Sequence, residues 1–394
     1  MKRLLTLLTL AVGACAPSGP PAVPPVPMEG GEALEGPFSV ILFIGDGAGL
    51  TYWSAAKLSA SELAIEALPV VGLVDVEASN SRITDSAAGA TAFASGVRTF
   101  NGAIGVGPDS TPVQTVLELA ESRGMATGLV ATATLTHATP AAFAAHVPSR
   151  TYHNEIAAGI AERGIDVLLG GGRQFFDPRQ RPDSVDLLGR ITRRATYVTT
   201  PEQYRALNMD TVRTLVGLFA ENNPPPAGSR EPALAELTRG AIDVLARDRD
   251  GFFLMVEGSQ IDWRGHENAP LREVIAEVLD FDLAIREALR FQGERRSNTL
   301  IVVVADHSTG GLALHADAMG VFRAHYTTEG HTAEMVPLFA GGPGAAAFGG
   351  VKDNDVVGRL LLEMVARGGP ARARARASTE SGAEWIPSSQ SPRR

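Results

Sequence analysis

The sequence predicts an α/β fold, a three-layer sandwich in which helices flank both faces of a central, mostly parallel sheet. Two observations indicate this class. Short apolar runs rich in β-branched residues alternate with longer segments of helical periodicity along most of the 394 residues. The apolar runs lack the polar–apolar alternation of half-exposed strands, which is typical of strands buried on both faces. Alternating strands and helices of this kind favour a parallel sheet covered on both sides.

The elements follow one another from residue 38 onward. The first strand is expected at 39–44, an apolar run that ends in Gly45-Asp46-Gly47. Further strands are expected at 126–130, 165–169, 252–256, 299–304 and 335–340. Helices are expected at 113–123, 152–163, 234–247, 271–290 and 356–366. Segment 175–223 is more polar and weakly periodic, which indicates an excursion at the periphery of the fold.

The two ends of the chain differ in composition from this domain at 38–367. Residues 1–14 have the charged start and short apolar middle of an export signal, and Cys15 follows as in a lipoprotein signal. Ordinary cleavage that leaves a free thiol at Cys15 is the alternative. Residues 15–37 form a Pro/Gly-rich spacer and 368–394 a tail with the composition of disorder. We therefore expect an exported protein, periplasmic or extracellular, either anchored through a lipid or free.

The charge of the chain bears on its partners. The formal net charge is −9, and no long basic stripe precedes the tail, which argues against a nucleic-acid partner. With a single cysteine the chain has no intrachain disulfide. An acidic protein that handles phosphate needs local positive charge from metals or arginines.

Segment 84–92, Thr-Asp-Ser-Ala-Ala-Gly-Ala-Thr-Ala, places the hydroxyl of Ser86 beside the carboxylate of Asp85 at the expected start of a helix. A helix start presents free N–H groups and a positive dipole end to an anion, so Ser86 is a candidate nucleophile. Capping of the helix by Thr84 or Asp85 explains the same pattern without catalysis. The segment alone does not decide between these interpretations.

Polar side chains capable of binding metal recur where the predicted strands end. They are Asp46, Glu257, Asp262, His266, Asp306, His307 and, before the strand at 335–340, His331. Singly, each is explained by a cap, a salt bridge or a structural hydrogen bond. In open α/β sheets, however, ligands bind beyond the carboxyl ends of the strands. Three histidines and four carboxylates there predict a multinuclear site, with zinc at mixed N/O positions and magnesium where only oxygens meet.

With these residues in place, the chain resembles the alkaline phosphatase family from about residue 38 to residue 366. The resemblance rests on seven motifs in the order of the family, each weak alone. They are Phe-Ile-Gly-Asp-Gly at 43–47, Thr-Asp-Ser-Ala at 84–87, Thr-His-Ala-Thr-Pro at 136–140, Ala-His-Val-Pro-Ser-Arg at 145–150, Val-Glu-Gly-Ser-Gln-Ile-Asp at 256–262, Ala-Asp-His at 305–307 and Gly-His-Thr at 330–332.

The resemblance implies a role for each site residue. One Zn²⁺ would be held by Asp262, His266 and His331, and a second by Asp46, Asp306, His307 and the Ser86 oxygen. A Mg²⁺ would be held by Asp46, Thr139 and Glu257. Ser86 would then attack the phosphorus of a small phosphate monoester and form a phosphoserine, while Arg150 binds two phosphate oxygens. Asp85 becomes a residue that positions Arg150 or local backbone.

Three features depart from other members of the family. His137 stands where some members carry an aspartate near the magnesium, so zinc at the third site is the alternative. Trp263 stands where some carry a lysine or histidine, which predicts weaker retention of phosphate. Only 24 positions separate His307 from His331, where several relatives carry a longer insertion used in dimer contact. Both a homodimer and a monomer therefore remain open.

The predicted function is hydrolysis of phosphate monoesters. A phosphodiesterase of the same superfamily is the alternative enzyme, and a lipid-tethered module that binds metal or phosphate without catalysis is the alternative from another class. The remaining histidines are expected outside the metal site. His146 is interpreted as a structural histidine, His153 as a surface residue at a helix start, and His315 and His325 as members of the short insertion.

Overall fold

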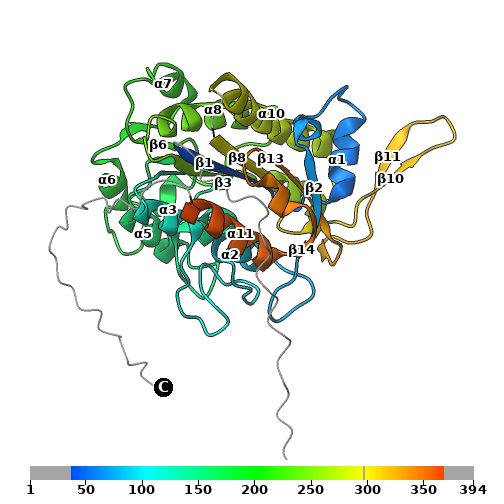
Figure 1. The fold of residues 1–394 in the computed structure, drawn as a ribbon, viewed down its shortest axis with the longest axis horizontal. Coiled ribbons are helices and arrows are strands. Elements are labelled where there is room, and N and C mark those ends of the chain that lie inside the picture. Colours follow the sequence, from blue (N-terminus) through cyan, green and yellow to red (C-terminus); the bar gives the residue numbers. More distant parts are fainter. Residues whose placement is uncertain (1–36, 296–297, 368–394) are drawn as a thin grey trace, which may run out of the picture. The chain divides into compact units, whose positions relative to one another are not determined.

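The computed structural model describes residues 37–295 and 298–367. The predicted export signal, Cys15 and the C-terminal tail lie outside these residues, as does all but the last residue of the spacer. Ten strands form the central sheet in the order β14-β2-β13-β8-β1-β7-β3-β4-β6-β5 (Figure 1). In that order their bounds are Gly350–Asp353, Val70–Asp75, Val336–Gly341, Asn298–Val304, Phe38–Gly45, Phe252–Gly258, Ala126–Thr134, Val167–Gly171, Leu215–Leu218 and Thr196–Val198.

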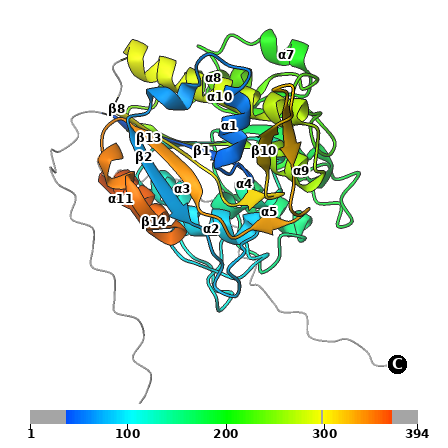
Figure 2. The ribbon, with the colours of Figure 1, turned by 90° about the vertical axis from the view of Figure 1, so that its right-hand side faces the viewer.

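Helices cover both faces of this sheet, as Figures 1 and 2 show. One layer contains α1 (Leu50–Lys57), α8 (Leu234–Leu245) and α10 (Leu271–Arg295), with α8 and α1 packed against α10. The other layer comprises α2 (Ser86–Ser95), α3 (Val116–Ser122), α4 (Ala138–Ala144), α5 (His153–Glu162) and α11 (Asn354–Arg367). The predicted three-layer α/β sandwich is confirmed.

The shorter elements lie in the connections. The helices among them are η1 (Ala64–Ala67), η2 (Arg173–Phe175), α6 (Leu187–Thr192), α7 (Pro201–Arg205), α9 (Gln260–His266) and η3 (Ala345–Phe348). Two small antiparallel pairs complete the described chain, β9 (Ser308–Thr309) with β12 (His331–Thr332), and β10 (Ala313–Ala316) with β11 (Phe322–His325). None of the helices in the described ranges is long and apolar enough to cross a membrane.

The first strand, β1, lies at the centre of the sheet and is buried over its whole length. It runs parallel to both neighbours, with Ile44 in register with Glu257 of β7 and with Val304 of β8. Aromatic packing closes the core above it, because the ring of Phe281 on α10 meets Phe43 at 6.0 Å between centroids. The register places the carboxyl ends of three central strands, and the residues that follow them, at one edge of the sheet.

The structure differs from the sequence-based expectation in three respects. The strand at 336–341 runs antiparallel to both β2 and β8, a direction that apolar periodicity does not reveal. Strands β2 and β14 were not predicted, because exposed residues such as Val71 and Val351 interrupt a buried-strand pattern. The prediction for 175–223 was incomplete, since this segment also supplies β5 and β6 to the sheet.

Candidate active site

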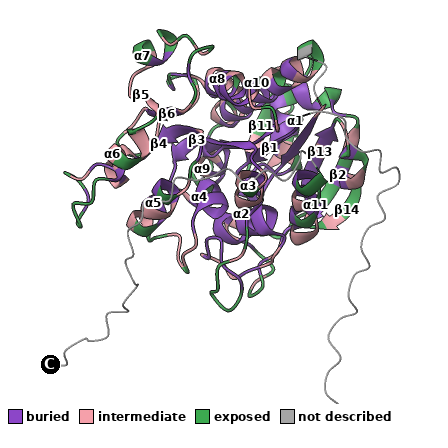
Figure 3. Cartoon of the chain, turned by 60° about the vertical axis from the view of Figure 1, so that its left-hand side comes forward, coloured by how far each residue is buried: buried purple, intermediate pink, exposed green. Residues whose placement is uncertain are grey.

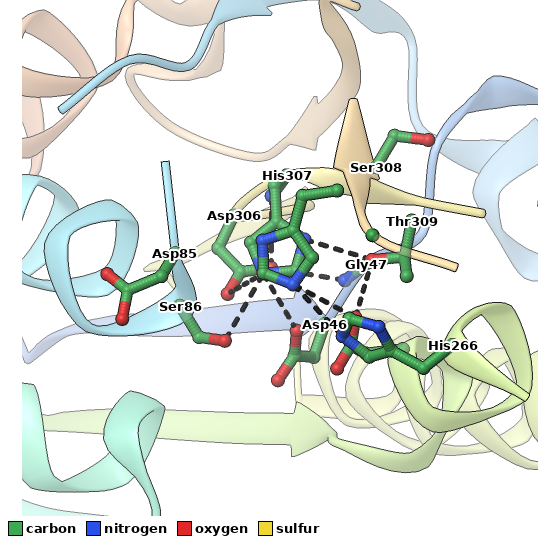
Figure 4. Close-up of polar contacts among 12 residues, drawn as sticks. Asp46, Gly47, Asp85, Ser86, His266, Asp306, His307, Ser308 and Thr309 are labelled. Atoms are coloured by element: carbon green, nitrogen blue, oxygen red, sulfur yellow. Dashed lines mark hydrogen bonds and ion pairs between the residues drawn. The ribbon is translucent and has the colours of Figure 1, made fainter. Parts of the chain in front are cut away.

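The carboxylates that follow β1 and β8 meet at the carboxyl edge of the sheet. Asp46 and Asp306 are both buried, and His307 Nε2 lies 3.3 Å from Asp46 Oδ1 and 3.5 Å from Asp306 Oδ2. Figure 4 shows these side chains pointing toward one another from separate segments. The backbone N–H groups of Gly47 and His307 donate to Asp306 Oδ1. The second oxygen of Asp306 and both oxygens of Asp46 receive no hydrogen bond within the described chain.

A second group forms around Asp262 on the short helix α9. Four residues along the helix, His266 Nε2 lies 3.3 Å from Asp262 Oδ1, as one helical turn allows. His331 Nε2 approaches the same oxygen to 3.6 Å and His266 Nε2 to 3.1 Å. The His331 and His307 rings stack at 3.5 Å between centroids, so this group adjoins the first.

The local backbone allows this close approach. Gly47 has φ +70°, and a Cβ there would lie 2.8 Å from the Cα of Asp262. Only glycine combines that conformation with that distance at low cost. The loop after β1 therefore places Asp46 against α9 because residue 47 has no side chain.

Ser86 occupies the first position of α2 and is buried. Its Oγ lies 3.2 Å from Nε2 of His307 (Figure 4). The small residues after it explain the approach, since a Cβ on Gly89 would lie 2.9 Å from the Asp306 carbonyl oxygen. Helix α2 thus packs directly on the metal-ligand segment and directs its free N–H end toward the site.

Asp85 is both the cap of α2 and a partner of Arg150. Its Oδ1 accepts hydrogen bonds from the N–H groups of Ala88 and Gly102, both at 3.0 Å. Its Oδ2 accepts from Arg150 Nη1 at 3.0 Å. The other terminal nitrogen of Arg150 lies 3.4 Å from His137 Nε2. The guanidinium is therefore held from two sides beside Ser86.

A third group lies on the far side of Asp46. Asp46, His137 and Glu257 each offer one ligand atom, and these atoms lie within 4.8 Å of one another. Thr139 is buried in the first turn of α4, and His137 occupies the N-cap position two residues before it. The ring of Trp263 packs edge-on against His137 at 6.1 Å between centroids. His137 and Trp263 therefore lie together next to Glu257.

Burial dominates the electrostatics of the first and third groups. Burial, with repulsion from neighbouring carboxylates, raises the pKa of Asp46 and of Asp306 well above the ordinary range. Burial raises the pKa of Glu257 to about 7. Loss of hydration, with repulsion from Arg150, lowers the pKa of His137 to about 3. Its imidazole is thus neutral, and the ring nitrogen that carries no proton is available as a ligand.

At Asp262 the balance has the opposite sign. Burial opposes its charge, but the hydrogen bond to His266 and the nearby His307 and His331 lower its pKa overall. The hydrogen bond to Asp262 in turn raises the pKa of His266 to about 9. Asp262 and His266 therefore stabilise each other's charged forms, whereas burial and neighbouring carboxylates dominate at Asp46 and Asp306.

The residues present fit metal ions. A buried carboxylate oxygen that accepts no hydrogen bond destabilises the fold unless a cation binds it. The ligand atoms fall into three neighbouring groups with nitrogen and oxygen donors, Asp262 with His307 and His331, Asp46 with Asp306 and His307, and Asp46 with His137 and Glu257. Mixed imidazole and carboxylate sets suit zinc, and carboxylate with hydroxyl suits magnesium.

All predicted metal ligands are brought to this edge of the sheet, and one participant was missed. Thr309 Oγ1 donates to Asp262 Oδ1 at 2.5 Å and lies 3.2 Å from His307 Nδ1. It fixes one ligand from each of two groups. Its only signal in the sequence is its place two residues after His307, which a lone threonine does not make specific.

The remaining histidines lie outside these groups. His146 bonds Glu118 Oε1 at 2.9 Å and the Gly105 carbonyl oxygen, as expected of a structural histidine. The surface assignment of His153 was wrong, because its ring is partly buried, stacks on Phe175 at 4.7 Å and contacts Thr136. His315 and His325 pack on each other in the β10–β11 hairpin.

The comparisons with known proteins agree on one family. The family model described as alkaline phosphatase matches residues 39–325. Alkaline phosphatase 3 of Bacillus subtilis (strain 168) is 39% identical over 300 residues, which cover 71% of this chain and 63% of that protein. Alkaline phosphatase of Escherichia coli (strain K12) is 32% identical over 395 residues, 80% of this chain and 83% of that protein. The chain spans roughly half to two thirds of the first curated relatives, with 63% and 51% of the two Bacillus proteins.

Solved structures give the same result. The alkaline phosphatase from the Antarctic bacterium TAB5 superposes with a TM-score of 0.78 at 37% identity, covering 84% of this chain and 98% of that one. A variant of that enzyme, with aspartate in place of a histidine, is described with magnesium bound in a site called M3. A family model that matches most of the described residues, together with relatives above 30% identity over four fifths of the chain, shows that the chain belongs to the alkaline phosphatase family.

Proposed function

We propose that the protein hydrolyses phosphate monoesters, with Ser86 as the nucleophile at a site for two zinc ions and one further cation. One observation carries the proposal. The Ser86 hydroxyl, at the positive end of α2, lies 3.2 Å from His307, the residue shared by two of the three ligand groups. A nucleophile, an anion-binding helix start and the ligand groups thus converge on one point.

The residues that would hold the ions are those that the family resemblance implies, and they overlap with the three groups, in which His307 stands with Asp262 and His331. Asp262, His266 and His331 would hold one zinc, and Asp46, Asp306 and His307, with the Ser86 oxygen, the other. Asp46, Thr139 and Glu257 would hold magnesium. His137, neutral and next to Glu257, adds a nitrogen that favours zinc as the alternative ion there. When bound, such ions supply positive charge that lowers the pKa of a serine hydroxyl or water and stabilises a leaving oxygen.

The protein's own groups perform the transfer in two displacements. Ser86 Oγ gives its proton to water and forms a bond to phosphorus, while the bond from phosphorus to the leaving oxygen breaks. That oxygen takes a proton from water and departs as the alcohol. Water then attacks the phosphoserine, which restores the hydroxyl of Ser86 and releases inorganic phosphate. Asp85 takes no proton in this scheme, because its oxygens are engaged by Arg150 and by backbone N–H groups.

Arg150 supports a monoester as the substrate. Its planar fork matches two non-bridging phosphate oxygens, a geometry that lysine does not offer. The hydrogen bond from Nη1 to Asp85 fixes the plane of the fork beside Ser86. A diester has one fewer charged oxygen for this fork, so the clamp favours the dianionic monoester.

The test compares wild type with Ser86→Ala for release of nitrophenol from nitrophenyl phosphate at alkaline pH, with zinc and magnesium present. We expect turnover to fall by at least about a thousandfold, because the nucleophile is lost. Ser95→Ala is the matched control, since Ser95 ends the same helix, is buried and bonds only local backbone. Equal rates in wild type and Ser86→Ala would refute the phosphoserine route and favour a non-catalytic binding module.

A parallel assay on bis-nitrophenyl phosphate separates the two esterase activities. Higher efficiency on this diester than on the monoester would establish the alternative phosphodiesterase. Export to the periplasm or beyond, and a lipid at Cys15, remain predictions from residues 1–15 of the sequence. The choice between homodimer and monomer likewise remains a prediction that sedimentation can test.

A further inference from the structure

A second concentration of positive charge lies far from Ser86, at the amino edge of the sheet. A cavity of about 390 Å³ opens between the end of α5, the loop before β4 and helix α6. Arg163 lines this cavity together with three arginines of the α6 region. These three, Arg190, Arg193 and Arg194, are here called the arginine cluster. No acidic side chain lines the cavity. In a chain of net charge −9 such a lining is unusual.

The arginine cluster is exposed and unpartnered. Arg163 already pairs with Glu118 and donates to the Ala144 carbonyl oxygen. Arg190, Arg193 and Arg194, by contrast, form no hydrogen bond or ion pair with any described residue. Figure 3 shows α6 beside α5 at the side of the fold, with much of its surface exposed. The guanidinium N–H groups of the arginine cluster are therefore free to bind an anion.

The floor of the cavity is apolar. Buried Ile160 and Ala161 of α5, Ile165 and Leu168 form it, together with partly exposed Ile191. A rim of guanidinium groups over an aliphatic floor suits a ligand with an anionic end and an apolar or ring-shaped body. The volume falls in the range of small-molecule sites, about 300–1,000 Å³.

The neighbouring cavity provides an internal comparison. It has about 220 Å³ and shares Thr214, but Asp166 and Asp248 line it together with Arg213 and Arg247. Arg247 there donates to the carbonyl oxygens of Met209 and Val212. Charge is thus balanced in the smaller cavity and uncompensated in the larger one.

We propose that the larger cavity is a second, non-catalytic binding site for a small organic phosphate. The arginine cluster would hold the phosphate, and the ligand's apolar part would lie on Ile165 and Leu168. Arginine's planar fork is suited to phosphate oxygens. Strands β1, β7, β3, β4 and β6 all run parallel to one another. The residues before β4 and β6 therefore lie at the edge of the sheet opposite the one that carries Asp46. A ligand here and a substrate at Ser86 therefore bind independently of each other's contacts.

The test is calorimetric titration of the metal-loaded full chain with phenylphosphonate, whose carbon–phosphorus bond resists ester hydrolysis. We expect two classes of site in wild type. In Arg193→Ala/Arg194→Ala one class should weaken at least about tenfold, because charged hydrogen bonds are lost, while kcat and KM for nitrophenyl phosphate stay unchanged. The control Arg239→Ala/Arg272→Ala removes the same charge from exposed positions of α8 and α10 and should keep both classes.

Each outcome decides the proposal. One class of site in wild type, or an unchanged titration of Arg193→Ala/Arg194→Ala, would overturn it. Inorganic phosphate that binds this site as tightly as phenylphosphonate would overturn the role of the apolar floor. Failure of the proposed hydrolysis has a different signature, namely an active Ser86→Ala variant, and leaves the two-site titration intact.

Discussion

Two edges of one sheet each collect side chains of like charge, but at different depths. At the carboxyl edge Asp46 and Asp306 are fully buried and have like-charged neighbours. At the amino edge Arg190, Arg193 and Arg194 are exposed. Unpaired buried charge costs several kcal/mol, on the order of a domain's whole stability, whereas solvated charge costs little. The carboxyl edge therefore requires resident counter-ions, and the amino edge can stay empty until a ligand arrives.

Chelation tests this difference most strongly. We expect EDTA to abolish turnover and to remove about 4 kcal/mol of stability at a thousandfold excess of metal over its dissociation constant. The ligands come from segments as distant as Asp46 and His331, so the metals join parts of the fold. Calorimetric melting with and without EDTA provides the measurement. An unchanged melting temperature would show that the buried carboxylates are accommodated without metal.

The effect of Asp46→Asn on the free energy of unfolding should have opposite signs with and without metal. In metal-loaded protein the substitution removes a ligand of two groups and should cost about 3 kcal/mol. In chelated protein it removes a carboxyl whose pKa is raised by burial and by Asp306, which opposes folding above the ordinary pKa, and should therefore stabilise the fold on the order of 1 kcal/mol. Urea unfolding in both states measures this, with exposed Asp109→Asn as the control. Destabilisation in both states would show that Asp46 is held by something other than cations.

His146 represents a third case, charge that is satisfied internally. Burial opposes its protonation, but hydrogen bonds to Glu118 and to the Gly105 carbonyl oxygen outweigh it and raise the pKa. The extra stability is therefore complete below the ordinary pKa near 6.5 and is lost as pH rises through the folded value. We expect His146→Gln to cost about 1 kcal/mol near pH 5.5 and less near pH 9.

Urea unfolding at the two pH values tests His146→Gln, with exposed His325→Gln as the control. Because metal ligands also titrate, each variant is compared with wild type at the same pH. A cost that grows with pH would mean that neutral His146, and not its charged form, is the partner of Glu118.

The smallest effect is expected at the amino edge. Arg193→Ala/Arg194→Ala should leave the free energy of unfolding within about 0.5 kcal/mol of wild type, because both side chains are exposed and unpartnered. Urea unfolding without added ligand measures it, beside Arg239→Ala/Arg272→Ala. A loss above about 1 kcal/mol would show that the arginine cluster stabilises the fold, so that the charge at the amino edge is not merely solvated.

The sequence was most informative where residue type and position coincide. Unbroken apolar runs predict buried strands, and the polar residues that follow them, such as Asp46 and Asp306, indicate the carboxyl edge of the sheet. Strand direction leaves no such trace, so the antiparallel direction of β13 was not predicted. Strands β2 and β14, at one side of the sheet, were not predicted at all. The contact of Asp85 with Arg150 was expected from the family resemblance, because no local pattern specifies where a residue 65 positions away will lie.

The arginine cavity was missed for a related reason. Its lining comes from α5, α6 and the residues before β4 and β6. Arg190, Arg193 and Arg194 lie in the weakly periodic segment 175–223, where no helix was predicted. Thr309 was missed because a single hydroxyl has no pattern of its own. In both places the tertiary arrangement, and not any run of residues, makes the site.

The central position of β1 has a consequence for how the molecule forms. The first strand of the fold pairs only with strands that begin at Phe252 and Asn298, more than two hundred residues later. Contacts so remote in sequence close slowly, since the entropy of a long loop precedes any gain from pairing. Asp46 therefore meets Glu257 and Asp306 only after the strands that precede them have paired with β1, so we expect the three ligand groups to assemble late in folding.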